Sequence, residues 1–289
     1  MKLLLLGGTA EARELAARLA GRPDLSLVSS LAGRVRDPLL PAGEVRVGGF
    51  GGVPGLVGWL RDERIGLVVD ATHPYAATMQ ANAAAACDRL GLPRLRLARP
   101  GWRAGDGDRW HWVGSLPEAA AALPSLGTRV FLTTGRQGLA VFAGLDRLWF
   151  LIRCVDRPSG PMPARGQVLL ARGPYRREEE RALMERFAVE VLVAKDSGGS
   201  LTAGKLDAAR DLRLPVVMVR RPPPTPGPSV ATVEEAAAWV RRQAAGCGQP
   251  NASPPVVGYA PPPGDPAPDR AGQARPSADT GTPPARRGV

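Results

Sequence analysis

Short apolar runs alternate with amphipathic stretches along residues 1–245 of the chain. The run Leu3–Leu6 has the length of a buried strand, and the apolar positions Leu15, Ala16 and Leu19 after it share one face of a helix. Further strands are expected in the first half at Leu25–Ser30, Glu44–Val47 and Ile65–Val69. Strands that alternate with helices at this spacing predict βαβ units and therefore a parallel sheet.

The second half of the chain repeats the plan of the first. Four segments recur in the same order at a nearly constant offset, which indicates an internal duplication. They pair Leu3–Thr9 with Val130–Arg136, Ala86–Pro93 with Ala208–Pro215, Arg99–Pro100 with Arg221–Pro222, and Ser115–Ala120 with Thr232–Ala237. The prediction is an α/β protein with two similar Rossmann-like domains, residues 1–124 and 125–245, whose parallel sheets face a central cleft.

Proline and glycine are concentrated at the end of the chain. Residues 246–289 contain 11 prolines and 7 glycines and hardly any large apolar side chain. Such a segment cannot bury enough surface to offset its loss of conformational entropy, so we predict a disordered C-terminal tail. Most of the formal net charge of +11 then belongs to the two domains.

The composition disfavours several classes of protein. No apolar run is long enough for a membrane span or for the core of a signal peptide, so we expect a cytoplasmic protein. The cysteines Cys87, Cys154 and Cys247 form no CxxC pair, so neither a disulfide framework nor a metal site is expected. A basic nucleic-acid-binding protein stays a less favoured alternative, because the arginines are dispersed and only 5% of the residues are aromatic.

Glycines and polar residues follow the predicted strands, at the sheet edge where open α/β folds bind ligands. The loop Gly7–Thr9 can bring backbone N–H groups to a phosphate, although a tight turn would use the same residues. The next strand ends in Ser29 and Ser30, with Arg34 shortly after and no carboxylate. An arginine there suits the 2′-phosphate of NADP(H), whereas NAD(H) is usually met by an acidic residue.

Other loops carry further candidate chemistry. Gly48–Gly52 is either a close approach to a ligand or a strained turn, and Asp70–Thr72 either contacts a ligand or caps the following helix. Lys195–Gly199 is a candidate anion site, and Arg136 can meet a carboxylate with two parallel hydrogen bonds. The chain lacks GxSxG and GxxxxGK[ST], which disfavours a serine hydrolase and a P-loop NTPase.

Together these segments resemble the precorrin-6A reductase family of cobalamin biosynthesis, over residues 1 to about 242. The resemblance lies in Leu5–Ala12, Ser30–Arg34, Val47–Gly52, Asp70–Ala76, Phe131–Arg136, Lys195–Gly199, Lys205–Arg210 and Pro215–Pro222. It implies NADPH-dependent reduction of the C18=C19 bond of precorrin-6A to give precorrin-6B, or of the cobalt-containing equivalent. It also implies that the first domain binds NADP(H) and that the second closes over the macrocycle.

The basic charge suits this small-molecule substrate, because precorrins carry many carboxylates. The alternative enzyme is another NADP-dependent reductase or epimerase on the same fold. Many such enzymes use a Tyr-x-x-x-Lys pair, which this chain lacks. Neither a nucleic acid nor a membrane is expected as a partner, and the sequence does not fix the oligomeric state.

The expected site residues fall into three groups. The catalytic candidates are Lys195 and His73, although Tyr75 or water can also deliver the proton that the reduction needs. The expected contacts to NADPH are Gly7, Gly8, Thr9, Ser29, Ser30, Arg34, Gly49, Asp70 and Thr72. The expected contacts to the substrate are Tyr75, Thr134, Arg136, Ser197, Gly198, Gly199 and Lys205.

Overall fold

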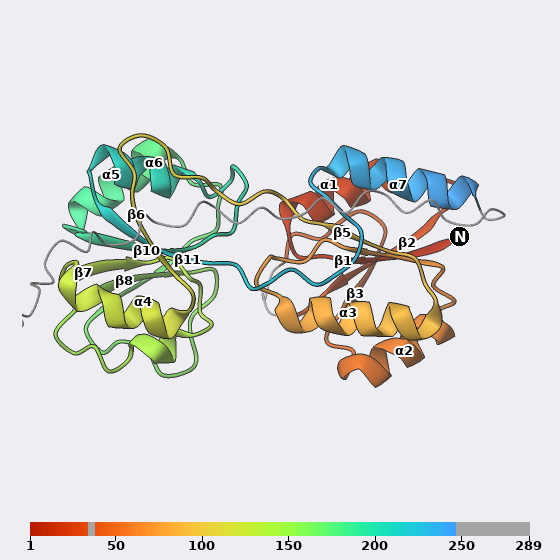
Figure 1. Ribbon diagram of the computed structural model, residues 1–289, viewed down its shortest axis with the longest axis horizontal. Helices are drawn as coiled ribbons and strands as arrows, with labels where there is room; N and C mark the ends of the chain where they lie inside the picture. Colours follow the sequence, from red (N-terminus) through yellow and green to blue (C-terminus); the bar gives the residue numbers. More distant parts are fainter. Residues whose placement is uncertain (34–37, 247–289) are drawn as a thin grey trace, which may run out of the picture. The chain divides into compact units, whose positions relative to one another are not determined.

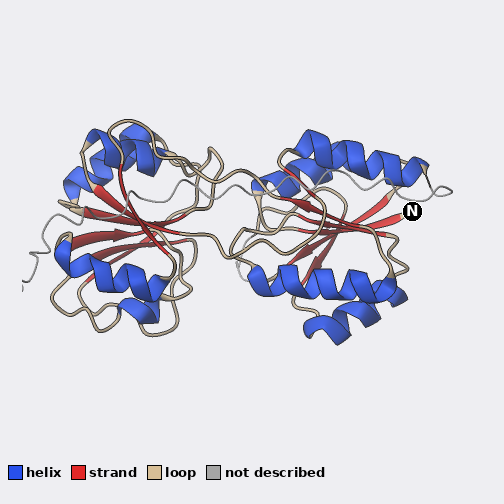
Figure 2. Ribbon diagram, in the orientation of Figure 1, coloured by secondary structure: helices blue, strands red, loops and turns tan. Residues whose placement is uncertain are grey.

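The computed structural model describes residues 1–33 and 38–246, which form two α/β domains (Figure 1). Each domain has a six-stranded sheet in which all paired strands are parallel. Helices cover both faces of each sheet (Figure 2). This confirms the predicted fold class, while the segment 247–289, which we predict to be a disordered tail, lies outside the described residues.

The first sheet is built mainly from the first third of the chain. Its strand order is β12-β5-β4-β1-β2-β3. The elements are β1 (Lys2–Leu6), α1 (Ala10–Leu19), β2 (Ser26–Leu31), β3 (Glu44–Val47), α2 (Gly52–Asp62), β4 (Leu67–Asp70), α3 (Ala77–Leu90) and β5 (Arg94–Leu97), joined by β12 (Ser229–Val230) and α7 (Val233–Ala245) near the end of the chain. The four strands predicted in this half are present, with shifts of up to two residues at their ends.

The second sheet repeats this order with its own strands, as β6-β11-β10-β7-β8-β9. Its elements are β6 (Arg109–Val113), α4 (Leu116–Ala122), η1 (Leu123–Ser125), β7 (Arg129–Leu132), η2 (Leu139–Phe142), β8 (Trp149–Cys154), β9 (Gly166–Leu170), α5 (Arg177–Arg186), β10 (Val191–Lys195), α6 (Gly204–Asp211) and β11 (Pro215–Val219). The matching orders agree with the predicted duplication and are those of dinucleotide-binding folds.

The two sheets exchange their last strand and helix. After β5 the chain crosses to the second sheet, where β6 pairs with β11, and after β11 it crosses back, where β12 pairs with β5. The predicted domain boundary at 124/125 therefore differs from the division made by the sheets. The repeat in sequence marks where each half ends, but it does not show which sheet each terminal strand joins.

Burial on both faces explains the run of leucines in β1. Leu3 and Leu5 pack with α1 and α7, whereas Leu4 and Leu6 pack with α2 and α3 on the opposite face. All four are at most 1% exposed, and each contributes about 1.5–3 kcal/mol relative to an exposed position. A strand this deeply buried holds the loop that follows it in a fixed place. No described helix is long and apolar enough to cross a membrane.

Candidate functional site

The loop between β1 and α1 lies where the strand order of the first sheet reverses, between β1 and β4. Thr9 caps α1, because its Oγ1 accepts from the Ala12 N–H at 3.1 Å and donates to the Ala71 carbonyl at 2.8 Å. Gly8 has a φ of 105°, and a Cβ added there would meet no atom within 4 Å. This open loop at a helix N-terminus can receive a phosphate.

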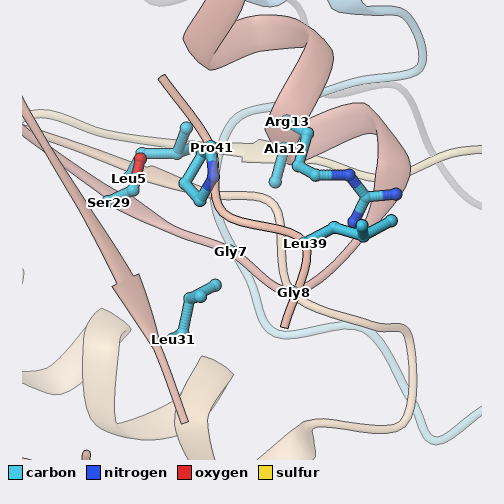
Figure 3. Close-up of a pocket in the computed structure, with 9 residues that line it drawn as sticks. All are labelled: Leu5, Gly7, Gly8, Ala12, Arg13, Ser29, Leu31, Leu39 and Pro41. Atoms are coloured by element: carbon cyan, nitrogen blue, oxygen red, sulfur yellow. The ribbon is translucent and has the colours of Figure 1, made fainter. Parts of the chain in front are cut away.

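Two recesses flank this loop. The first is lined by Leu5, Gly7, Gly8, Ala12, Arg13, Ser29, Leu31, Leu39 and Pro41 (Figure 3). The second is lined by Thr9, Glu11, Ala71, Thr72, Pro74, Arg96, Leu97, Ala98 and Arg99. Both recesses are small and adjoin the same loop, so a ligand that used both would cross it.

The two serines of β2 are buried beside the first recess. Ser29 is 1% exposed, and its Oγ has no hydrogen-bond partner among the described residues. Ser30 is 6% exposed, and its carbonyl accepts from the Gly7 N–H at 2.9 Å. A buried hydroxyl without a partner is costly, so an acceptor on a ligand would relieve Ser29. Arg34 lies outside the described residues.

Arg46 on β3 holds the loop Gly48–Gly52 from one side. Its guanidinium donates to the carbonyls of Gly48 at 2.7 Å and Gly49 at 2.6 Å, and it stacks over the Phe50 ring at 3.8 Å. A Cβ added to Gly49 would meet no atom within 4 Å, so the other side of the loop is open. Arg46 gave no signal in the sequence beyond its position before the glycines.

Asp70 is buried and positions Thr72. One carboxylate oxygen pairs with Arg96 at 2.9 Å, while the other accepts from the backbone N–H of Thr72 at 3.0 Å and from its Oγ1 at 2.7 Å. Asp70 is 0% exposed, so its carboxylate has no surface open to a ligand. Thr72 lines the second recess, and it is the member of this pair that a ligand can reach.

His73, Tyr75 and Lys195 lie close together. The Lys195 ammonium is 5.3 Å from the centre of the Tyr75 ring, and the Tyr75 hydroxyl donates to the Val219 carbonyl. Burial, with Arg99, Lys195 and other cations nearby, lowers the pKa of His73 to about 3, so its imidazole is neutral near pH 7. Burial also lowers the pKa of Lys195.

The loop after β7 is partly open. Thr134 is 7% exposed, and its Oγ1 has no hydrogen-bond partner within the part of the chain that the structure describes. Gly135, with a φ of 77°, has no atom within 4 Å of an added Cβ. The Arg136 side chain is 37% exposed and lies 3.8 Å from Asp156, which leaves room for a further carboxylate.

The loop after β10 is closed by the protein itself. The Ser197 carbonyl accepts from Arg99 at 2.7 Å, and the Gly199 carbonyl accepts from the Trp102 indole at 3.0 Å. A Cβ on Gly198 would lie 2.1 Å from the Pro100 carbonyl oxygen. These glycines therefore allow the backbone of the crossover segment after β5 to approach closely. Ser197, Gly198 and Gly199 were expected to contact the substrate, but in this structure they contact the protein itself.

Asp196 and Arg221 complete this closure, and sequence reasoning did not select them. Asp196 is 2% exposed, accepts from the Trp102 N–H at 2.9 Å and pairs with Arg221 at 3.2 Å. Arg221 also donates to the carbonyls of Asp196, Arg99 and Pro100. The repeated Arg-Pro pairs at 99–100 and 221–222 are the feature of the sequence that marks these two arginines.

Lys205, expected to bind substrate, is buried at the start of α6. It is 5% exposed, and its ammonium lies 4.8 Å from the centre of the Trp102 ring. Burial, with Arg153 nearby, lowers its pKa to about 7. In this structure Lys205 is covered by the ring of Trp102, whose indole N–H donates to the Gly199 carbonyl. Among the described residues no group of three or more His, Cys, Asp or Glu side chains is placed to hold a metal ion.

The strand order, with helices on both faces of each sheet, defines a two-domain protein of the doubly wound α/β class, a fold that many dinucleotide-binding proteins share. The family model described as Precorrin-6x reductase CbiJ/CobK matches residues 2–241, and the chain belongs to this family.

Known proteins of similar sequence or structure agree with this assignment. A precorrin-6A reductase from Rhodococcus erythropolis is 53% identical over 83% of this chain and 97% of its own length. A cobalt-precorrin-6A reductase from Priestia megaterium is 29% identical over 81% of this chain and 95% of its own length. A solved structure titled CobK precorrin-6A reductase superposes with a TM-score of 0.79 at 42% identity, covering 83% of this chain and 96% of the other.

Proposed function

We propose that the protein uses NADPH to reduce the C18=C19 bond of precorrin-6A, giving precorrin-6B. The observation that carries the proposal is the open β1–α1 loop at the point where the strand order reverses, with a recess on each side. Family membership supports the reaction. The higher identity to the precorrin-6A reductase, 53% against 29% for the cobalt-precorrin enzyme, favours the cobalt-free substrate.

The residues of the first domain fit a dinucleotide. The buried, unpartnered Ser29 hydroxyl and the open space at Gly8 and Gly49 are features that a bound ligand would fill. Gly8 and Thr9 would hold the pyrophosphate at the start of α1, with Gly49 and Thr72 further along the cofactor. Bound NADPH supplies the hydride, and the protein contributes orientation and charge.

Substrate binding is proposed for residues of the second domain. Arg136 and the unpartnered Thr134 hydroxyl stand after β7 and can meet carboxylates of the macrocycle. Lys195 has an ammonium beside Tyr75, and burial moves its pKa toward neutrality. The hydride goes to one carbon of the C18=C19 bond and a proton to the other. We assign that proton to the Lys195 ammonium, because the His73 imidazole is neutral near pH 7 and is not an imidazolium acid.

The test is incubation of the purified protein with precorrin-6A and either NADPH or NADH, followed by absorbance of the macrocycle. We expect turnover with NADPH and a kcat/KM about tenfold or more lower with NADH. The Lys195→Met variant tests the proton donor. It should bind NADPH as the unmodified protein does and turn over at least about 100-fold more slowly. No NADPH-dependent change in the macrocycle would refute the proposed function.

A further inference from the structure

We propose that Arg13 on α1 binds the 2′-phosphate of the cofactor and so distinguishes NADPH from NADH. This inference rests on the proposed use of NADPH. It names the residue that would produce a preference for NADPH over NADH, which the reaction itself does not require. It concerns the first recess, which lies on the β2 side of the loop Gly7–Gly8 (Figure 3).

The position of this recess corresponds to the adenosine end of a dinucleotide. In dinucleotide-binding folds, the strand after the first helix ends beside the ribose that carries the 2′ position. Here that strand is β2, and its Ser29 and Leu31 line the recess. The pyrophosphate would lie at the start of α1, so the ribose next to it falls within reach of the recess.

The walls of the recess suit an adenosine. Leu31, Leu39 and Pro41 provide apolar surface, and Leu39 is 55% exposed. A large apolar side chain that is exposed at the edge of a polar loop gains if a flat ring covers it. None of the described lining residues is acidic, so a phosphate group would meet no like charge there.

Arg13 differs from Arg18 and Arg22, the next two arginines of the chain, because no carboxylate among the described residues pairs with it. Arg18 pairs with Glu14 and Glu234, and Arg22 pairs with Asp24. Arg13 makes no ion pair or hydrogen bond with any residue that the structure describes, and it lines the recess beside Gly8 (Figure 3). A guanidinium presents paired N–H groups that match two phosphate oxygens.

Ser29 supplies the second, independent observation. Its side-chain oxygen is buried, lacks a hydrogen-bond partner, and belongs to a residue that lines the same recess. A hydroxyl in that state can donate to a ligand oxygen without losing an internal bond. Arg13 and Ser29 therefore offer a charged and a neutral donor to one anionic group on the ribose.

Titration calorimetry with four ligands tests the inference: NADPH, NADH, 2′-phosphoadenosine 5′-monophosphate and 5′-AMP. Arg13→Gln should weaken binding of the two ligands with a 2′-phosphate by about tenfold or more and change the other two by less than about twofold. Ser29→Ala should act in the same direction by about threefold. The matched control is Arg61→Gln, because Arg61 is exposed on α2, which covers the opposite face of the sheet. It should leave all four affinities unchanged.

The outcomes separate this inference from the proposed function. If the unmodified protein prefers NADPH and Arg13→Gln keeps that preference, the inference fails and the proposed function stands. An equal loss for NADPH and NADH would place Arg13 at a shared part of the cofactor, which also refutes it. If the unmodified protein binds NADPH no better than NADH, the inference fails, and the proposed reduction is decided separately by turnover of precorrin-6A with NADPH. Arg13→Lys, which keeps the charge but not the paired donors, should lose an intermediate amount and serves if the Gln variant unfolds.

Discussion

Two glycine-rich loops that follow parallel strands in this protein use glycine for different reasons. In the loop 48–52, a Cβ added to Gly49 or Gly51 would meet no atom within 4 Å. In the loop 195–199, a Cβ on Gly198 would lie 2.1 Å from the Pro100 carbonyl oxygen, and one on Gly199 would lie 3.3 Å from the Arg99 side chain. The first loop leaves space that a ligand can use, whereas the second makes space for the protein's own backbone.

Their neighbours differ in the same way. Arg46 supports the first loop by donating to two of its carbonyls, and the backbone N–H of Gly49 has no partner among the described residues. The second loop is enclosed by Arg99, Trp102 and Arg221. A glycine-rich strand end therefore marks a close approach, and only the structure shows whether a ligand or the chain itself makes it.

Removal of Arg221 should have the largest effect on the closed loop 195–199. Arg221→Met leaves the Asp196 carboxylate buried without its ion-pair partner and removes donors from three carbonyls. The free energy of unfolding, measured by urea denaturation, should fall by about 3–5 kcal/mol. The neighbouring Arg220, whose charge lies over the Trp112 ring, provides the control, and Arg220→Met should cost less than about 1 kcal/mol. Similar losses for both variants would mean that Arg221 does not hold the loop closed.

The matched pair Gly198→Ala and Gly49→Ala tests the glycines directly. Gly198 has a φ of 66°, and its new methyl group would collide with backbone, so this variant should lose about 2–4 kcal/mol of stability. Gly49→Ala should change stability by less than about 0.5 kcal/mol, because nothing lies near the new methyl group. In a NADPH titration the order should reverse, with Gly49→Ala weakening binding more than Gly198→Ala at a temperature where both are folded. Equal stability losses would remove the distinction between the loops.

Much of the fold could be predicted because it depends on local patterns in the sequence. The leucine run of β1 and the spacing of Leu15 and Leu19 follow from burial alone. The duplicated segments predict two similar domains, and the two sheets have matching strand orders. The exchange of β6 and β12 could not be predicted. Each of these edge strands pairs with a parallel neighbour in either arrangement, and the choice depends on contacts far apart in sequence.

The positions of some candidate site residues follow from the sequence, because they stand at their own strand ends, while their roles stay predictions. Thr9, Thr72 and Thr134 are at such ends, and the structure places them beside open space or without a partner. Contacts between residues far apart in the sequence could not be predicted. Arg221 and Trp102 both contact Asp196, and the Trp102 ring lies near the ammonium of Lys205, which was expected to contact the substrate.

The smallest effect on stability is expected at Lys205, which is buried next to the closed loop 195–199. Its pKa of about 7 in the folded protein lies below the ordinary 10.5, so the unfolded chain binds more protons between these values. The free energy of unfolding should therefore rise with pH above 7 as this burial cost disappears. Lys205→Met removes the buried charge, so it should be more stable by about 1 kcal/mol at pH 7 and should lack this rise between pH 7 and 9 in urea denaturation. The prediction fails if the free energy of unfolding of Lys205→Met still rises between pH 7 and 9 while its affinity for precorrin-6A falls. That result would indicate that Lys205 contacts the substrate and that a ligand can reach the loop 195–199.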